Sequence, residues 1–241
     1  MYDLHDELIF FADTKAFVCD YESWYDDNGT FYNTRIESFN SDLSSLKNGN
    51  SMFMFCDMLS DFKGDLSSLE NGSLMFSYCN SLESFTSSDL SSLKNGFGMF
   101  SYCNALAEFE SDLSSLTDGS EMFADCFNLT TFTSDLSSLT KSYRMFNNCW
   151  ELSTFNCNDL SSLNNGISMF MDCENLISFN CNDLSSLENG WGMFAGCEKL
   201  TKFDCDLSSL TNGEHMFGYD YVLENFAADL SSLVSGNYMF C

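Results

Sequence analysis

Nine aspartates recur at a fixed interval and are the most regular groups in this sequence that could do chemistry. Each begins the pentapeptide Asp-Leu-Ser-Ser-Leu, and successive copies start 23 or 24 residues apart. Like charges about 5 Å apart repel by roughly 0.8 kcal/mol per neighbouring pair in water, so an offsetting interaction is required. We expect an Asx turn, in which each carboxylate accepts a hydrogen bond from a backbone N–H of the Ser-Ser pair. Calcium along the column is the alternative, because Ca²⁺ takes several oxygen ligands; we expect no bound metal or other cofactor. The nine are Asp42, Asp65, Asp89, Asp112, Asp135, Asp159, Asp183, Asp206 and Asp229.

Most of the cysteines fall into two columns of the same period. Adjacent turns of a stack lie roughly 4.7–4.9 Å apart, but parallel Cα–Cβ vectors do not bring the Cβ atoms to the separation that a disulfide prefers. No Cys-x-x-Cys pair is present to suggest zinc. We therefore expect buried free thiols that act as small hydrophobic groups. One column is Cys56, Cys79, Cys103, Cys126, Cys149, Cys173 and Cys197, which Asp220 interrupts, and the other is Cys157, Cys181 and Cys205.

Catalytic constellations are not evident in the sequence. The two histidines, His5 and His215, lie far apart, and the many serines belong to the repeated pentapeptide. No nucleophile has an evident base, and acid pairs such as Asp204 and Asp206 are common in a chain this acidic. We expect no enzymatic activity.

Composition favours a packed acidic protein. The net charge is −27, from 36 acidic against 9 basic residues, which argues against nucleic acid and anionic membrane surfaces as partners. Apolar residues make up 44% and aromatic residues 16%, far more than in a disordered acidic tail. No apolar run reaches 18 residues, so membrane insertion is not expected. Met1 to Glu7 are acidic where a signal peptide would be basic; either the chain is not secreted by that route or a leader has been removed.

The pentapeptide belongs to a longer repeat, D-L-S-S-L-x-N-G-x-x-M-F-x-x-C-x-x-L-x-x-F-x-(small). Positions are counted below from the aspartate, so Met-Phe stand at positions 10 and 11, and the last Phe at position 20. That Phe and the small residue after it share one face of a short strand. The Asn-Gly pair predicts a turn in which a positive φ is tolerated. Met-Phe-x-x-Cys-x-x-Leu, with apolar residues three and four apart, predicts a short helical or 3₁₀ segment.

Stacking of these units predicts a leucine-rich-repeat-type solenoid of about nine turns, with a parallel sheet of short strands on one side and the helical or 3₁₀ segments on the other. Residues 36–241 form the solenoid, and its last repeat is incomplete because Cys241 follows Phe240 directly. Either the sequence is part of a longer array, or this open end docks on a partner. Residues 1–35 lack the repeat and are predicted to be the N-terminal cap, with a hairpin-like turn at Asp26–Gly29.

The segment G-x-x-M-F-x-x-C-x-x-L-x-x-F resembles the BspA-like leucine-rich repeat, whose pattern has Ala-Phe-x-x-Cys-x-x-Leu and a preceding Gly at the same spacing. The resemblance runs from Ile36 to the C-terminus in nine copies. The departures are Met in place of Ala, and Asp-Leu-Ser-Ser-Leu where the family usually has a turn that contains Pro. The resemblance implies a non-enzymatic surface protein for adhesion or partner binding; similar arrays also occur in virion components.

Aromatic residues outside the core pattern are the best candidates for a binding surface. Such residues often mark interfaces or glycan contacts; the alternative is that they lie partly buried against neighbouring turns. The strand side has no aromatic stripe, only residues such as Thr131, Thr154 and Ser178. The candidates are Phe97, Tyr143, Trp191, Tyr78, Tyr102, Phe127, Trp150 and Tyr221.

Two functions remain as hypotheses. The first is a non-catalytic binding or adhesion module that meets a protein or glycan partner, extracellular on a cell surface or virion. The second is a structural subunit of a filament, virion or appendage that self-assembles through the open C-terminal end.

Overall fold

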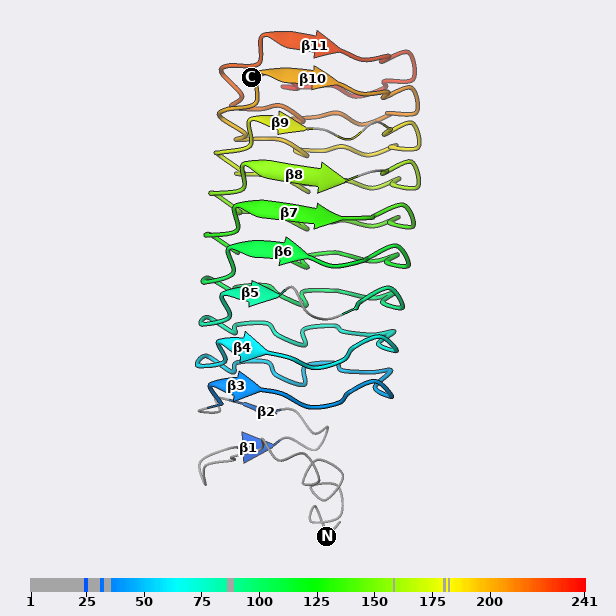
Figure 1. The fold of residues 1–241 in the computed structure, drawn as a ribbon. Coiled ribbons are helices and arrows are strands. Elements are labelled where there is room, and N and C mark those ends of the chain that lie inside the picture. Colours follow the sequence, from blue (N-terminus) through cyan, green and yellow to red (C-terminus); the bar gives the residue numbers. More distant parts are fainter. Residues whose placement is uncertain are drawn as a thin grey trace.

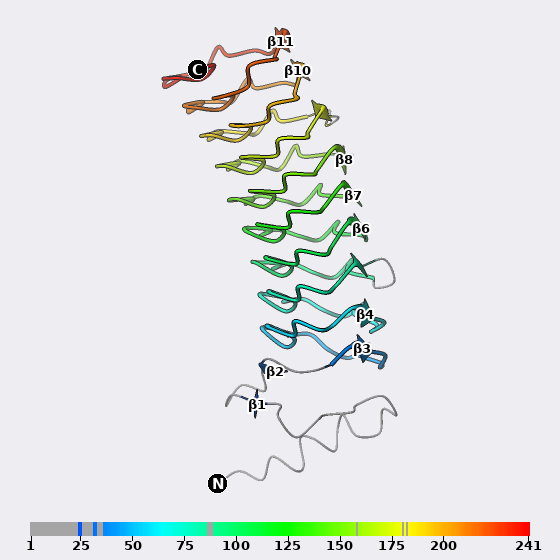
Figure 2. The same ribbon diagram turned by 90° about the vertical axis from the view of Figure 1, so that its left-hand side faces the viewer.

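The computed structural model describes residues 36–85, 89–157, 159–179, 181 and 183–241, and two short strands at 24–25 and 31–32. The chain winds into a column of stacked turns, and the strands lie above one another along one side of it (Figure 1). Turned by 90°, each turn is a flat loop displaced slightly from the one below (Figure 2). The strands of the column are β3 (Ser38–Phe39), β4 (Asp61–Phe62), β5 (Ser84–Phe85), β6 (Glu108–Glu110), β7 (Thr131–Ser134), β8 (Thr154–Cys157), β9 (Ser178–Phe179), β10 (Lys202–Asp204) and β11 (Asn225–Ala227).

The predicted solenoid and its parallel sheet are confirmed. Every paired neighbour in the column is parallel, and the position-20 Phe of one strand stands opposite that of the next, as Phe132 does to Phe155. The ladder is divided into sheets β3–β4, β5–β9 and β10–β11. A second continuous line of parallel bridges joins position 6 of each turn, from Asn48 to Ser235. Equivalent positions of the repeat therefore lie over one another through the described turns.

Most of the predicted cap, residues 1–35, lies outside the described residues. Within it, β1 (Trp24–Tyr25) and β2 (Phe31–Tyr32) pair antiparallel, with Trp24 opposite Tyr32. Antiparallel strands on both sides of 26–30 agree with a hairpin, but the turn itself lies outside the described residues.

The prediction of helical or 3₁₀ segments on the other side of the column is wrong. The described residues contain strands and tight turns but no helix. In this stretch the N–H groups alternate between two acceptors: Phe123 donates to Met145 of the next turn at 2.8 Å, whereas Met122 donates back to Gly119 at 3.0 Å. Left-handed residues at positions 9 and 13, such as Glu121 (φ 56°) and Asp125 (φ 60°), interrupt any helix. The spacing of three and four reflects a run of tight turns whose alternate N–H groups bond to the neighbouring turn.

The turn at the Asn-Gly pair does not use the positive φ that this pair would tolerate. Among the described glycines only Gly98, Gly192 and Gly196 have positive φ, and none of them follows the Asn. Glycine at position 7 allows a close approach instead: a Cβ on Gly119 would lie 3.0 Å from the Met145 sulfur of the next turn. The fifth turn has Ser142 at this position and buries it. The Asn side chain forms a second Asx turn in the repeat. In the fourth repeat Asp118 takes the place of this Asn and accepts a hydrogen bond from the Ser120 N–H at 3.1 Å.

Two stacks of phenylalanine rings fill the core. Neighbouring rings of the position-11 ladder lie 5.3–5.5 Å apart and those of the position-20 ladder 5.3–6.1 Å apart, with edge-to-face contacts between the ladders. Offset stacking and edge-to-face contacts are the geometries that aromatic rings favour. The position-11 ladder is Phe53, Phe76, Phe100, Phe123, Phe146, Phe170, Phe194, Phe217 and Phe240, and the position-20 ladder is Phe39, Phe62, Phe85, Phe109, Phe132, Phe155, Phe179, Phe203 and Phe226.

The cysteines of both columns are buried, as predicted. They do more than fill space, because thiols of the position-14 column donate to the carbonyl oxygen of the position-11 Phe in the turn below. Cys149, for example, lies 3.1 Å from the Phe123 oxygen, and five other thiols repeat this contact at 3.0–3.2 Å. Burial raises the pKa of these thiols well above its usual value, so they remain protonated donors.

The predicted Asx turn is confirmed in all nine copies. Each aspartate accepts a hydrogen bond at 2.7–2.9 Å from the N–H two residues later, as Asp135 does from Ser137. The serine side chain, and after it the backbone N–H, lowers the pKa of Asp42 and Asp183 below its usual value by hydrogen bonding. For Asp229 the backbone N–H has the larger effect and the serine side chain the smaller one. Within the described residues, no group of three or more His, Cys, Asp or Glu side chains could hold a metal ion. The carboxylates thus serve the turn.

This role predicts a difference between two substitutions at Asp135. Asp135→Ala removes the acceptor and should lower the free energy of unfolding by about 1 kcal/mol. Asp135→Asn keeps an oxygen in the same place and removes a like charge, so it should cost less than half as much. Urea unfolding of both variants measures the difference; equal losses would contradict the Asx role.

Candidate binding face

The strand side of the column is polar. Among the described strands its outward positions carry residues such as Glu108, Glu110 and Thr131, and two surface ion pairs, Lys63–Asp61 and Lys202–Asp204. As predicted, the outward positions of the described column strands, β3 to β11, carry no aromatic side chain. This side has the character of a solvated sheet face.

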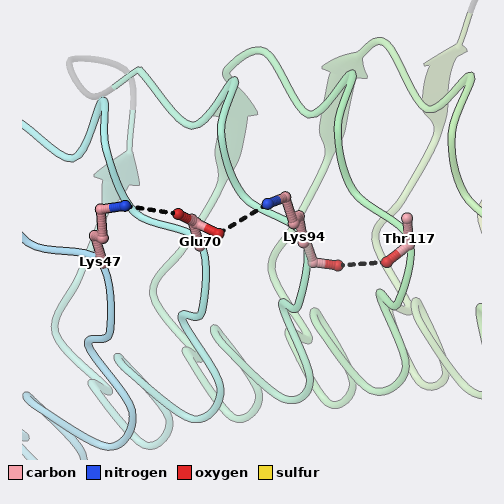
Figure 3. Close-up of polar contacts among 4 residues, drawn as sticks. All are labelled: Lys47, Glu70, Lys94 and Thr117. Atoms are coloured by element: carbon pink, nitrogen blue, oxygen red, sulfur yellow. Dashed lines mark hydrogen bonds and ion pairs between the residues drawn. The ribbon is translucent and has the colours of Figure 1, made fainter.

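The lysines at position 5 of the repeat form ion pairs within the column. Lys47 and Lys94 both bind Glu70, at 3.2 and 2.8 Å, and the Thr117 hydroxyl donates to the Lys94 carbonyl in the next turn (Figure 3). Here too like positions lie over one another, and the lysine charges are already paired. Among the described residues at position 5, both lysines are therefore paired and not free for an acidic partner.

The side opposite the strands carries the aromatic candidates. We call it the return face and define it as positions 8, 9, 12, 13, 15 and 16 of each turn. At position 13 the rings of Tyr78 and Tyr102 are stacked 4.4 Å apart, and Phe55 extends this stack below Tyr78 at 4.9 Å. Phe55 was missed in the sequence, although it stands at the same position as Tyr78 and could have been found from the repeat.

The stack at position 13 ends beside a carboxylate. Asp125, the position-13 residue of the next turn, accepts a hydrogen bond from Tyr102, and its charge, together with burial, raises the pKa of Tyr102 to about 12. Asn148 of the following turn donates to Asp125 at 2.7 Å. Tyr102 is therefore held in place and half-buried.

At position 8 the candidates do not form one cluster. Phe97, Tyr143 and Trp191 stand in alternate turns, so other residues separate them. The Arg144 guanidinium lies over the Tyr143 ring, 5.1 Å from its centre. Trp191 meets His215 edge to face at 5.9 Å.

Position 15 holds the most open group. Phe127 and Trp150 are stacked 4.3 Å apart, and Trp150 is 44% exposed. Above them the same position is occupied by Glu174, Glu198 and Tyr221, which are exposed. The column thus places carboxylates between aromatic rings.

The eight candidates divide evenly. Those that are exposed are Phe97, Tyr143, Trp150 and Tyr221, and those that are half-buried are Tyr78, Tyr102, Phe127 and Trp191. The alternative of partial burial against neighbouring turns therefore describes half of the set, and binding by any of them stays a prediction.

One hollow opens away from this face, between the second and third turns. It is lined by Lys63, Gly64, Asp65, Ser67 and Asp89. Asp65 and Asp89 already accept turn hydrogen bonds, and the lining residues include no histidine or cysteine that could activate Ser67. No helix long and apolar enough to cross a bilayer occurs in the part of the chain that the structure describes.

Comparison with known proteins places the chain by its repeats. The family described as BspA type Leucine rich repeat region, with 6 copies, matches residues 27–149 and 96–224. Among solved structures, the chain is similar to a leucine rich cell surface protein from Faecalibacterium prausnitzii, with 18% identity, a TM-score of 0.32 and coverage of 75% of this chain and 68% of that one. No curated protein matches the chain.

Proposed function

We propose a binding function for this chain, which belongs to the BspA type leucine-rich repeat family. It acts as a non-catalytic module that presents the return face to a partner, outside the cell and at a cell surface. The same binding role would apply if the surface is that of a virion.

The observation that carries this proposal is the exposure of large aromatic rings on a regular stack. Trp150 is 44% and Tyr221 76% exposed, although the core has two complete ladders for aromatic side chains. Rings of this kind bring large contact area with little conformational freedom to lose, and they are enriched in interfaces. Hydrogen bonds between turns fix the spacing of the rings, so they form a preorganised surface.

The ring geometry favours a protein partner over a glycan. Within the stacks the rings lie face to face, as Tyr78 and Tyr102 do at 7° between their planes. A sugar packs on an open ring face, whereas stacking covers most ring faces here; the end ring Trp150 keeps one face, which lies beside the carboxylate of the next turn. Ring edges with neighbouring carboxylates suit the side chains of a protein.

The test begins with an array of secreted and surface proteins beside a glycan array. For a partner found there, Tyr143→Ala and Trp191→Ala should each weaken binding by roughly tenfold and change the free energy of unfolding by less than about 1 kcal/mol. Surface plasmon resonance and urea unfolding give the two quantities. Unchanged affinity in both variants would refute the proposal, and a large loss of stability would show that the rings belong to the core.

Assembly through the last turn is the second candidate. Val234, Tyr238 and Phe240 in this turn are 85%, 64% and 54% exposed, and β11 pairs on one side with β10. Light scattering over a range of concentrations separates the two functions. Growth into filaments or rings supports assembly, and a constant monomer mass removes it.

A further inference from the structure

We infer that the partner of the return face carries an arginine- or lysine-rich segment, which docks along position 15 from Trp150 to Tyr221. This inference rests on the proposed binding function and assigns the chemistry of the partner. It commits to a cationic protein segment as the occupant.

The first support is the order of side chains in this column. Glu174 and Glu198 are exposed and lie in the two turns between Trp150 and Tyr221. The turns are held directly over one another: the Asn175 side chain donates to the Trp150 carbonyl at 2.8 Å, and the Asn175 N–H donates to it at 3.1 Å. Phe127 covers one face of the Trp150 ring, so the remaining face and edge are available on the side toward Glu174.

The second support is the charge of the surroundings. Within the described part of the chain Glu151, Glu174 and Glu198 form no ion pair. The nearby Lys199 instead hydrogen-bonds the side chain of Asn175. Burial, with a smaller contribution from the charge of Glu198, raises the pKa of Asp172 above its usual value.

The molecule contains a small example of the contact that we infer. The Arg144 guanidinium lies over the Tyr143 ring, a cation–π arrangement. Trp is the strongest partner for such a contact, and Trp150 has no cation of its own among the described residues. A guanidinium over Trp150 would also reach the carboxylates beside it, so both attractions act on the same group.

The geometry suits an extended chain. Trp150 and Tyr221 stand three turns apart, which is roughly 14–15 Å at the strand spacing, and an extended peptide covers this length in about four to five residues. A peptide that alternates arginine with a small residue would present its cations on one side, toward Trp150, Glu174 and Glu198.

The experiment uses the full chain and a blocked peptide of alternating arginine and serine, with a peptide of alternating glutamine and serine as the neutral probe. Isothermal titration at near-physiological salt measures both. Only the arginine peptide should bind, and Trp150→Ala should weaken it roughly tenfold. Thermal unfolding of Trp150→Ala should match the parent, since this ring lies outside the core.

A matched pair of double variants separates docking from general attraction to an acidic protein. Glu174→Gln with Glu198→Gln, and Glu108→Gln with Glu110→Gln on the strand side, change the net charge of −27 equally. The first pair of substitutions should weaken binding of the arginine peptide at least about fivefold, and the second pair less than twofold. Equal weakening by both pairs, or an unchanged affinity of Trp150→Ala, overturns the inference. The proposed function would survive that result if the array partner still depends on Tyr143 or Trp191.

Discussion

Phe146→Ala should lower the free energy of unfolding by about 4 kcal/mol, the middle of the range for deletion of a buried aromatic ring. Phe146 is fully buried and stacks on Phe123 and Phe170 at 5.3 Å each. It also meets Phe132 and Phe155 edge to face, at 4.8 and 5.5 Å. One truncation therefore removes four ring contacts and leaves a cavity in the middle of both ladders.

The shape of the transition should change as well. Each turn of a solenoid contacts only its neighbours, so stability is transmitted from turn to turn. A gap at Phe146 weakens the coupling between the two halves, and urea unfolding should broaden or split into two steps. Phe97→Ala is the matched control, because Phe97 is 37% exposed; it should cost less than about 1 kcal/mol. Similar losses for the two variants would contradict the inward placement of position 11.

Asp220→Cys should remove most of a loss of stability that the parent chain shows between about pH 4 and pH 8. Asp220 stands at position 14, where the seven preceding turns have Cys. Its two carboxylate oxygens are buried and lack a partner of hydrogen-bond geometry among the described residues. Burial, with a further contribution from Glu198, raises the pKa of Asp220 to about 8, although the backbone N–H of Cys197 offsets part of the rise.

The sign follows from proton linkage. The unfolded chain ionises Asp220 near its ordinary pKa of about 3.9, whereas the folded chain holds the proton until about pH 8. The folded state thus binds more protons in this window, and stability falls as the pH rises through it. We expect a fall of roughly 3 kcal/mol after allowance for partial exposure. A thiol in this place can donate to the Phe194 carbonyl as its counterparts do in the turns below.

Asp183→Asn provides a control of opposite sign. Hydrogen bonds from Ser185 lower the pKa of Asp183 in the fold, so its contribution is present at neutral pH and is lost as the pH falls through the folded pKa. This variant should keep the fall between pH 4 and pH 8. Urea unfolding at several pH values measures all three chains. A parent-like slope in Asp220→Cys would show that Asp220 is ionised and solvated.

Much of the fold could be predicted because each repeated residue has a local physical role. A Phe at position 20 followed two residues later by a small side chain, as at Phe132 and Ser134, indicates a strand with one buried face, and the structure has β7 there. Aspartate before Ser-Ser indicated the Asx turn. These inferences depend on local chemistry that is repeated in register, so one correct turn gives the others.

The return side could not be predicted in the same way. Apolar residues three and four apart fit a helix, but they fit equally a run of tight turns with left-handed residues at positions 9 and 13. Residues as different as Leu74, Glu121 and Arg144 adopt the left-handed conformation at position 9, so residue type gave no signal. The glycine at position 7 was assigned to the wrong cause because its neighbour, the Met sulfur, belongs to another turn.

The candidate face was predicted by residue but not by arrangement. Tyr78 and Tyr102 were identified from their position outside the core pattern, whereas face-to-face stacking depends on the stagger between turns. The grouping of Trp150 with Glu174 and Glu198 became visible once the turns were placed over one another. Exposure, which separates Trp150 from Phe127, depends on how neighbouring turns pack and not on the repeat pattern.

The stacking of each turn on the next can be tested most directly by NMR with methyl-labelled methionine. The Met145 sulfur and methyl carbon lie 3.0 and 3.1 Å from the Cβ site of Gly119, one turn below, and Met75 and Met193 make the same approach to Gly49 and Gly166. We predict a nuclear Overhauser effect from each of these methyl groups to the Hα protons of its glycine. Overhauser effects from these methyl groups to residues of non-neighbouring turns would contradict the solenoid on which the binding face depends. The absence of effects to all three glycines would contradict it as well.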